Sequence, residues 1–105
     1  SGPPPGAPAV DAPVSEGVWL LDQLPGRFTG LYFGSTDGAP TETEIASIPV
    51  SIHIADPNGE AAKRYDAQPG TIYLLRPDQH VAARWRTYDK SKFEAAIRRA
   101  TGHGL

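Results

Sequence analysis

The chain has 105 residues and no cysteine, so it suits a single domain and cannot form a disulfide, a thiolate nucleophile or a dithiol redox centre. It has no apolar run long enough to cross a bilayer and no basic leader before an apolar block, so the expected compartment is the cytoplasm. Seven acids and one base lie in residues 1–56, and five acids and nine bases in residues 57–105, but the bases are dispersed, which argues against a nucleic-acid partner.

Residues 1–16 contain five prolines among small residues. Because proline fixes φ and lacks an N–H, this stretch cannot form a helix or a central strand. It is predicted to be an extended Pro/Gly/Ala-rich connector. It is either a flexible tail or a connector that lies along a neighbouring domain. The folded domain is expected to span residues 17–105.

Residues 18–55 are predicted to contain two strands and one short helix. A dense apolar cluster at residues 18–21 is followed by a turn. Residues 27–33 place apolar groups on both faces of an alternating pattern, which predicts a central strand covered on each side. Thr41 and Glu44 have the spacing of a capping box, which predicts a short helix over residues 42–47. Residues 50–55 alternate as a strand with one face in the core.

The next segment is predicted to hold a helix and a β-hairpin. Asp56 and Pro57 suit an N-cap and a first helical position, so a helix is expected to begin there and to end near residue 66. Residues 71–75 and 80–86 are β-rich runs that flank a Pro-Asp turn. Alternation in the second run puts one set of side chains on a common face: Val81, Ala83 and Trp85.

The last segment is predicted to be a helix that packs on the sheet. Ser91 and Glu94 have the spacing of a second capping box, and Gly102 suits the position after the helix. An apolar stripe follows the helical repeat: Phe93, Ala96, Ile97 and Ala100.

Together these elements predict an α/β sandwich with a central mixed sheet of about four strands and two to three helices. Thioredoxin-like domains have this order. A thioredoxin carries its Cys-x-x-Cys motif after the first long strand, where this chain has residues 34–41 with only unactivated hydroxyls. The domain is therefore predicted to have no redox chemistry of its own.

No motif in the chain indicates catalysis or cofactor binding. None of the three histidines, His53, His80 and His103, lies three or four residues from another, which argues against a metal site. Nucleophile-elbow, dinucleotide-binding and Walker sequences are also missing. We predict no catalytic, cofactor-binding or metal-binding residue. Aromatic and half-polar side chains are predicted instead as interface anchors: Trp19, Tyr32, His53 and Trp85.

The hairpin sequence resembles a known family. Residues 75–78 (Leu-Arg-Pro-Asp) and 81–85 (Val-Ala-Ala-Arg-Trp) resemble the C-terminal end of FAD-dependent aromatic-ring hydroxylases, of the phenol hydroxylase-like and hydroxyphenylpropionate hydroxylase-like types. Residues 21–31 and 64–67 are similar to other parts of the same domain. The resemblance implies a thioredoxin-like domain that follows the flavin and substrate domains, and FAD and NAD(P)H sites in those preceding domains. Residues 34–49 are short for the first helix of that domain.

Two functions are consistent with the sequence. The first is a structural or interaction domain of an FAD-dependent monooxygenase, whose partners are the FAD and substrate domains of the same polypeptide or a second subunit. In this case the chain is not an enzyme by itself. The second is an independent, redox-inactive thioredoxin-like module that binds a peptide or a small molecule.

Overall fold

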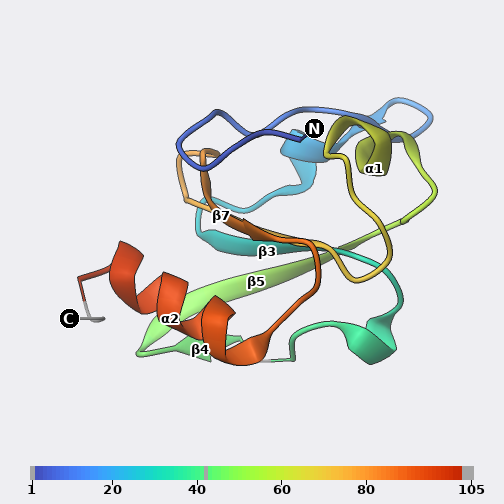
Figure 1. Cartoon of the computed structure of the whole chain (residues 1–105). Helices are drawn as coiled ribbons and strands as arrows, with labels where there is room; N and C mark the ends of the chain where they lie inside the picture. The colour runs from blue at the N-terminus through green and yellow to red at the C-terminus, as the bar shows by residue number, and fades with distance from the viewer. Residues whose placement is uncertain (1, 42, 103–105) are drawn as a thin grey trace.

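The computed structural model describes residues 2–41 and 43–102, which form a five-stranded mixed sheet in the order β4–β5–β3–β6–β7 (Figure 1). The N-terminal segment and α1 cover one face of the sheet, and α2 covers the other. This confirms the α/β sandwich with a mixed sheet. The strands of the main sheet are β3 (Phe28–Phe33), β4 (Glu44–Ile45), β5 (Ile48–Ala55), β6 (Ile72–Leu75) and β7 (Val81–Trp85).

The remaining elements are shorter pieces around this sheet. A separate two-stranded ribbon pairs β1 with β2. The bounds of these elements are β1 Pro13–Ser15, β2 Val18–Trp19, α1 Glu60–Arg64 and α2 Lys90–Ala100, with 3₁₀ helices η1 at Leu20–Gln23 and η2 at Thr36–Gly38.

Two apolar cores lie on opposite faces of the sheet. The N-terminal core contains Ala12, Leu20, Leu31, Phe33, Tyr65, Tyr73, Leu75 and Val81. The α2 core contains Tyr32, Ile45, Val50, Ile72, Leu74, Phe93, Ala96 and Ile97. Because β3 contributes to both cores, it is the central strand that its two apolar faces predicted.

β3 pairs in parallel with β5 and antiparallel with β6. Gly30 allows the helix to approach this strand, since a Cβ there would lie 2.9 Å from the Phe93 ring and 3.1 Å from the Ile52 side chain. The glycine in the middle of the strand is therefore a packing requirement of α2.

The β6–β7 hairpin and its turn are confirmed. The Gln79 N–H donates to the Arg76 carbonyl at 2.9 Å, which places Pro77 and Asp78 at the centre of the turn. Gln79 itself has φ +62, as in hairpins whose type I turn is followed by one left-handed residue.

The predicted common face of β7 is wrong. Leu75 pairs with Val81, whereas Leu74 pairs with Ala83, so Ala82 is an extra residue in the strand. A β-bulge of this kind reverses the alternation. Val81 consequently joins the N-terminal core, while Ala83 and Trp85 pack against the α2 core.

The helix predicted over residues 42–47 is also wrong; Glu42 itself lies outside the described residues. The chain forms β4 there and turns through Ala46 and Ser47, at φ 52 and 67, into β5. A helix of one or two turns ahead of Pro49 is marginal by itself. Pairing as a strand instead buries Ile45, which is 4% exposed.

Neither helix begins at the residue predicted to cap it. Asp56 accepts the Asn58 N–H at 2.8 Å in a turn, and α1 begins only at Glu60. The N-cap of α2 is Asp89, which accepts the Lys92 N–H at 3.0 Å. The predicted stripe is buried at Phe93, Ala96 and Ile97, but Ala100 is exposed. Gly102, at φ +81, follows the helix as expected.

The proline-rich segment packs on the sheet instead of hanging free as a tail. Gly6 donates to the Val81 carbonyl at 2.7 Å, and the Val81 N–H donates to Ala7 at 2.8 Å. Ala12 is fully buried. Residues 2–14 therefore supply the cover for one sheet face and for the start of β7. The division of the chain into a connector at 1–16 and a domain at 17–105 stays a prediction.

Candidate interaction surfaces

The described part of the chain offers no metal centre and no membrane span. No group of three or more His, Asp or Glu side chains in residues 2–41 and 43–102 is arranged to hold a metal ion. No helix in these ranges has the length and apolar character needed to cross a bilayer.

The four predicted anchors do not form one site. Trp19 in β2 is 44% exposed, and the Arg64 guanidinium lies 6.0 Å from its ring centroid. Tyr32 is only 6% exposed and makes an edge contact with Tyr88 in the core. His53 on β5 and Trp85 on β7 are half-buried on strands that lie on opposite sides of β3. Of the other histidines, His80 starts the second hairpin run and His103 lies outside the described residues.

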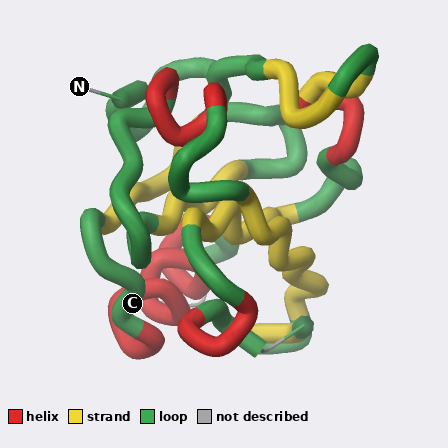
Figure 2. Tube along the Cα trace, turned by 90° about the vertical axis from the view of Figure 1, so that its right-hand side faces the viewer, coloured by secondary structure: helices red, strands yellow, loops and turns green. Residues whose placement is uncertain are grey.

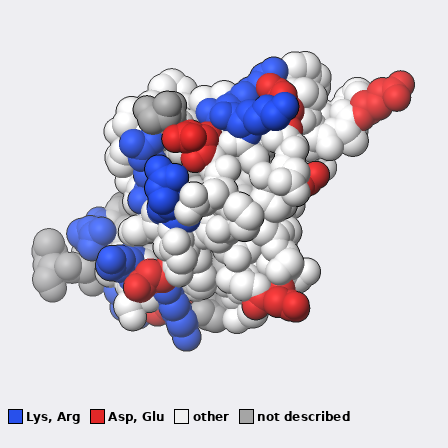
Figure 3. Space-filling view, turned by 45° about the vertical axis from the view of Figure 1, so that its right-hand side comes forward, with Lys and Arg blue, Asp and Glu red and all other residues white. Residues whose placement is uncertain are grey.

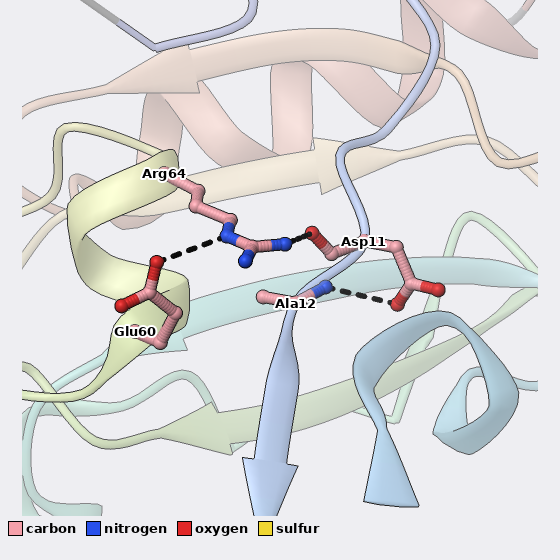
Figure 4. Close-up of polar contacts among 4 residues, drawn as sticks. All are labelled: Asp11, Ala12, Glu60 and Arg64. Atoms are coloured by element: carbon pink, nitrogen blue, oxygen red, sulfur yellow. Dashed lines mark hydrogen bonds and ion pairs between the residues drawn. The ribbon is translucent and has the colours of Figure 1, made fainter.

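Asp11 and Arg64 join the N-terminal segment to α1 (Figure 4). Arg64 donates through Nη1 to the Asp11 carbonyl at 3.0 Å and through Nε to the Glu60 carboxylate at 3.0 Å. The Asp11 carboxylate accepts the N–H groups of Ala12 and Leu21, each at 3.0 Å. These contacts fix the path of the segment across the sheet, and no local motif in the sequence indicated them.

A polar pocket of about 220 Å³ lies where the N-terminal segment meets β7, lined by Gly2, Asp66, Thr71, Tyr73, Arg84, Trp85 and Arg86. Arg84 donates through Nη1 to the carbonyls of Gly2 at 2.7 Å and Pro3 at 3.0 Å. The Tyr73 hydroxyl donates to the Tyr65 carbonyl at 2.6 Å, and burial raises the pKa of Tyr73. Because these polar groups already hold the chain itself, the pocket is a structural junction.

The outer side of β5, past the two residues that pair with β4, has no neighbouring strand in the part of the chain that the structure describes. A cavity of about 180 Å³ lies beside it, lined by Pro13, Val14, His53, Ile54, Ala55, Asp56, Gly59, Glu60 and Ala61. Val14 is 41% exposed and Ile54 is 38% exposed. Burial lowers the pKa of His53, which favours its neutral form beside these apolar groups. We call Val14, Ile52, His53 and Ile54 the β5 edge surface.

Sequence reasoning found only His53 in the β5 edge surface. Val14 lies in the predicted connector, and Ile54 lies in the strand predicted at residues 50–55. A usable signal was present, since residues 50–55 carry no Lys, Arg, Asp, Glu or Pro. Strands at sheet edges normally carry such residues.

Comparison with known proteins gives one informative match. Neither a protein-family model nor a curated protein matches the chain. Among solved structures, the chain is similar to aklavinone-11 hydroxylase, whose structure is a ternary complex with FAD and aklavinone. The two chains have 22% identity and a TM-score of 0.58. The match covers 80% of this chain but only 18% of that chain. At this level of identity the likeness establishes the fold, which this chain shares with a small part of an FAD-containing hydroxylase.

Proposed function

We propose that this chain is the C-terminal structural and interaction domain of an FAD-dependent aromatic-ring monooxygenase. The observation that carries the proposal is the fold match to a small part of aklavinone-11 hydroxylase. The hairpin sequence at residues 75–85 resembles the same class of enzymes independently of that match. In this proposal the parent protein is a cytoplasmic oxidoreductase.

The chemistry of the chain supports a role without catalysis. It contains no cysteine and no glycine-rich phosphate loop, and the polar groups of its pocket hold its own N-terminal segment. FAD and NAD(P)H then bind in preceding domains of the parent, and this domain contacts those domains or a second subunit. Its contribution is to the stability and assembly of the enzyme.

The first test is the natural reading frame. The proposal expects several hundred residues upstream that encode a dinucleotide-binding fold. The second test deletes the domain from the parent enzyme. The deletion should begin at Ser1, because residues 2–14 pack on this sheet and would be left without it by a cut at Gly17.

The truncated enzyme should keep its FAD content and its hydroxylation rate per bound flavin. It should form a smaller oligomer in solution than the full-length enzyme, or melt at a lower temperature. If the oligomeric state and the melting temperature stay unchanged and only hydroxylation is lost, the domain acts in catalysis. That outcome would contradict the proposal.

The alternative is an independent, redox-inactive module that binds a peptide or a small molecule. The observation in its favour is the β5 edge surface with its adjoining cavity. A reading frame that starts just before this chain would favour the alternative over the domain of a larger enzyme.

A further inference from the structure

The outer side of β5 is open over most of its length. β4 pairs with β5 only at Ile48 and Pro49, and the Val50 N–H then donates to the Thr43 carbonyl at 2.9 Å. Beyond Val50, no strand in the described part of the chain pairs with this side. In Figure 2 the β1–β2 ribbon lies above the strands of the main sheet, at the upper right of the view.

Strand geometry identifies the backbone groups on the open side. The Val50 N–H points away from β3, towards β4. Because the backbone groups of a strand alternate with a period of two, the N–H and C=O groups of Ile52 and Ile54 point outward as well. The Ala55 carbonyl points the other way and accepts the Gly34 N–H at 3.2 Å. Ile52 and Ile54 thus present backbone N–H and C=O groups that pair with no strand in the described part of the chain.

This edge lacks the features that keep natural sheet edges from pairing. Residues 51–55 contain no proline and no charged side chain, although lysine, proline or inward charges are the usual protection. Ile54 on one side of the edge and Val14 on the other are both exposed. An added strand would bury both side chains and fill the cavity beside His53.

Charge around the edge is acidic. Asp56 lines the cavity and forms no ion pair among the described residues, and the exposed Glu16 lies in the turn between β1 and β2. In Figure 3, Asp and Glu side chains lie along the right-hand side of the view, while Lys and Arg side chains lie mainly at its left and top. Two copies of the chain paired at this edge would add like charges to one interface, which opposes association. A basic strand is the better match.

We propose that the outer edge of β5 binds an extended strand of about five residues that carries a basic side chain, supplied by the body of the parent protein. The inference rests on the proposed function, because more than four-fifths of the similar hydroxylase lies outside the matched part. The strand bonds to the backbone of Ile52 and Ile54. Its alternate side chains contact Ile54 on one face and Val14 with His53 on the other, as in β-augmentation.

Hydrogen exchange of single amides tests this binding mode. The full-length protein is compared with the 105-residue chain. The amides of Ile52 and Ile54 should exchange at least about tenfold more slowly in the full-length protein, since a ladder hydrogen bond protects them there. Ser51 and His53, whose amides point towards β3, should exchange equally in both. Equal exchange at Ile52 and Ile54 overturns the inference.

Two variants strengthen the test. Ile54→Pro removes one outward N–H and leaves the β3 ladder intact, so the 105-residue chain should fold while Ile52 loses its protection in the full-length protein. If the proline prevents folding, Ile54→Lys serves instead, because it adds a charge to the edge. Ala100→Lys, at an exposed position at the end of α2, is the matched control and should leave protection unchanged. Retained protection in Ile54→Lys counts against the inference.

The outcomes separate this inference from the proposed function. Flavin in the full-length protein without protection of Ile52 and Ile54 overturns the inference and leaves the proposed function intact. Protection of Ile52 and Ile54 in a full-length protein that contains no flavin overturns the proposed function and leaves the binding of a strand intact. Protection that arises in the 105-residue chain alone as its concentration is raised assigns the edge to a second copy and also overturns the inference.

Discussion

Asp89 is the side chain that holds the first turn of α2. Its carboxylate accepts the Lys92 N–H at 3.0 Å, whereas Ser91 is exposed inside the first turn. Asp89→Ala should therefore lower the free energy of unfolding by about 1 kcal/mol, the usual effect of losing an N-cap. Ser91→Ala is the control and should change it by less than about 0.5 kcal/mol, as surface substitutions do. Urea denaturation distinguishes the two; an equal loss would mean that both residues cap the helix.

Tyr65 ties the N-terminal segment to the core. Its hydroxyl donates to the Val10 carbonyl at 2.6 Å, and burial raises the pKa of Tyr65 to about 12. In the unfolded chain the pKa is about 10, so the neutral phenol favours folding below that pH and this stabilisation is lost as the pH rises from about 10 to about 12. Tyr65→Phe should weaken that alkaline decline, measured by urea denaturation at a series of pH values. An unchanged decline would assign it to other groups.

Trp85 should contribute less than a fully buried ring. It is half-buried and makes an edge contact with Phe93 at a centroid distance of 5.9 Å. Trp85→Ala should cost about 2 kcal/mol, below the roughly 3–5 kcal/mol that removing a buried aromatic side chain costs. Phe93→Ala, at a position 1% exposed, is the comparison and should fall in the higher range. If Trp85→Ala costs as much as Phe93→Ala, the indole packs more deeply than the structure describes.

At the scale of elements, the β4–β5 turn stores local strain. Ala46 and Ser47 both have positive φ, at 52 and 67, and a left-handed conformation costs a residue with a Cβ roughly 1–2 kcal/mol. Ser47→Gly relieves that cost, partly offset by the greater entropy of glycine in the unfolded chain. We expect a gain in stability of about 0.5–1 kcal/mol in thermal or urea unfolding. Ser47→Ala keeps the Cβ and should give no gain; a gain in both variants would mean that the serine hydroxyl is the unfavourable group.

The helices of this chain are short relative to its sheet. α1 has 5 residues and α2 has 11, and helices of these lengths depend on packing for their stability. Arg64, Glu60 and the Asp11 carbonyl fix α1, and the buried stripe of α2 fixes the second helix. The segment at residues 2–14 does the covering that a longer first helix would otherwise do.

At the scale of the whole molecule, this segment should be indispensable. It covers the N-terminal core, which contains Leu31, Phe33, Tyr65 and Leu75. A chain of residues 17–105 would expose that core, so it should lose cooperative unfolding or melt at a clearly lower temperature, as measured by circular dichroism or calorimetry. Ala12→Asp, which places a charge at a fully buried position, should act in the same direction, and Ala100→Asp should not. An unchanged melting temperature for residues 17–105 would show that the segment is dispensable.

The sequence by itself determined the parts of this fold that depend on the pattern of residues within a single element. The two apolar faces of β3, the Pro-Asp turn of the hairpin and the stripe at Phe93, Ala96 and Ile97 each follow from the residues within one element. The absence of cysteine excluded dithiol chemistry without any structure. The aromatic residues of the predicted interface were found by type, but their type does not tell a core ring such as Tyr32 from an exposed one such as Trp19.

The other features of the fold were decided by the tertiary structure, because they depend on contacts between residues that are distant in the sequence. The proline-rich segment is held by Arg84, 82 residues from Gly2, and by Arg64, 53 residues from Asp11. The bulge at Ala82 depends on how β7 pairs with β6, and it places Trp85 on the opposite face of the sheet from Val81. The open edge of β5 exists because β4 is only two residues long. Cross-strand pairing and long-range burial are not encoded in any local window of sequence, so only the folded chain reveals them.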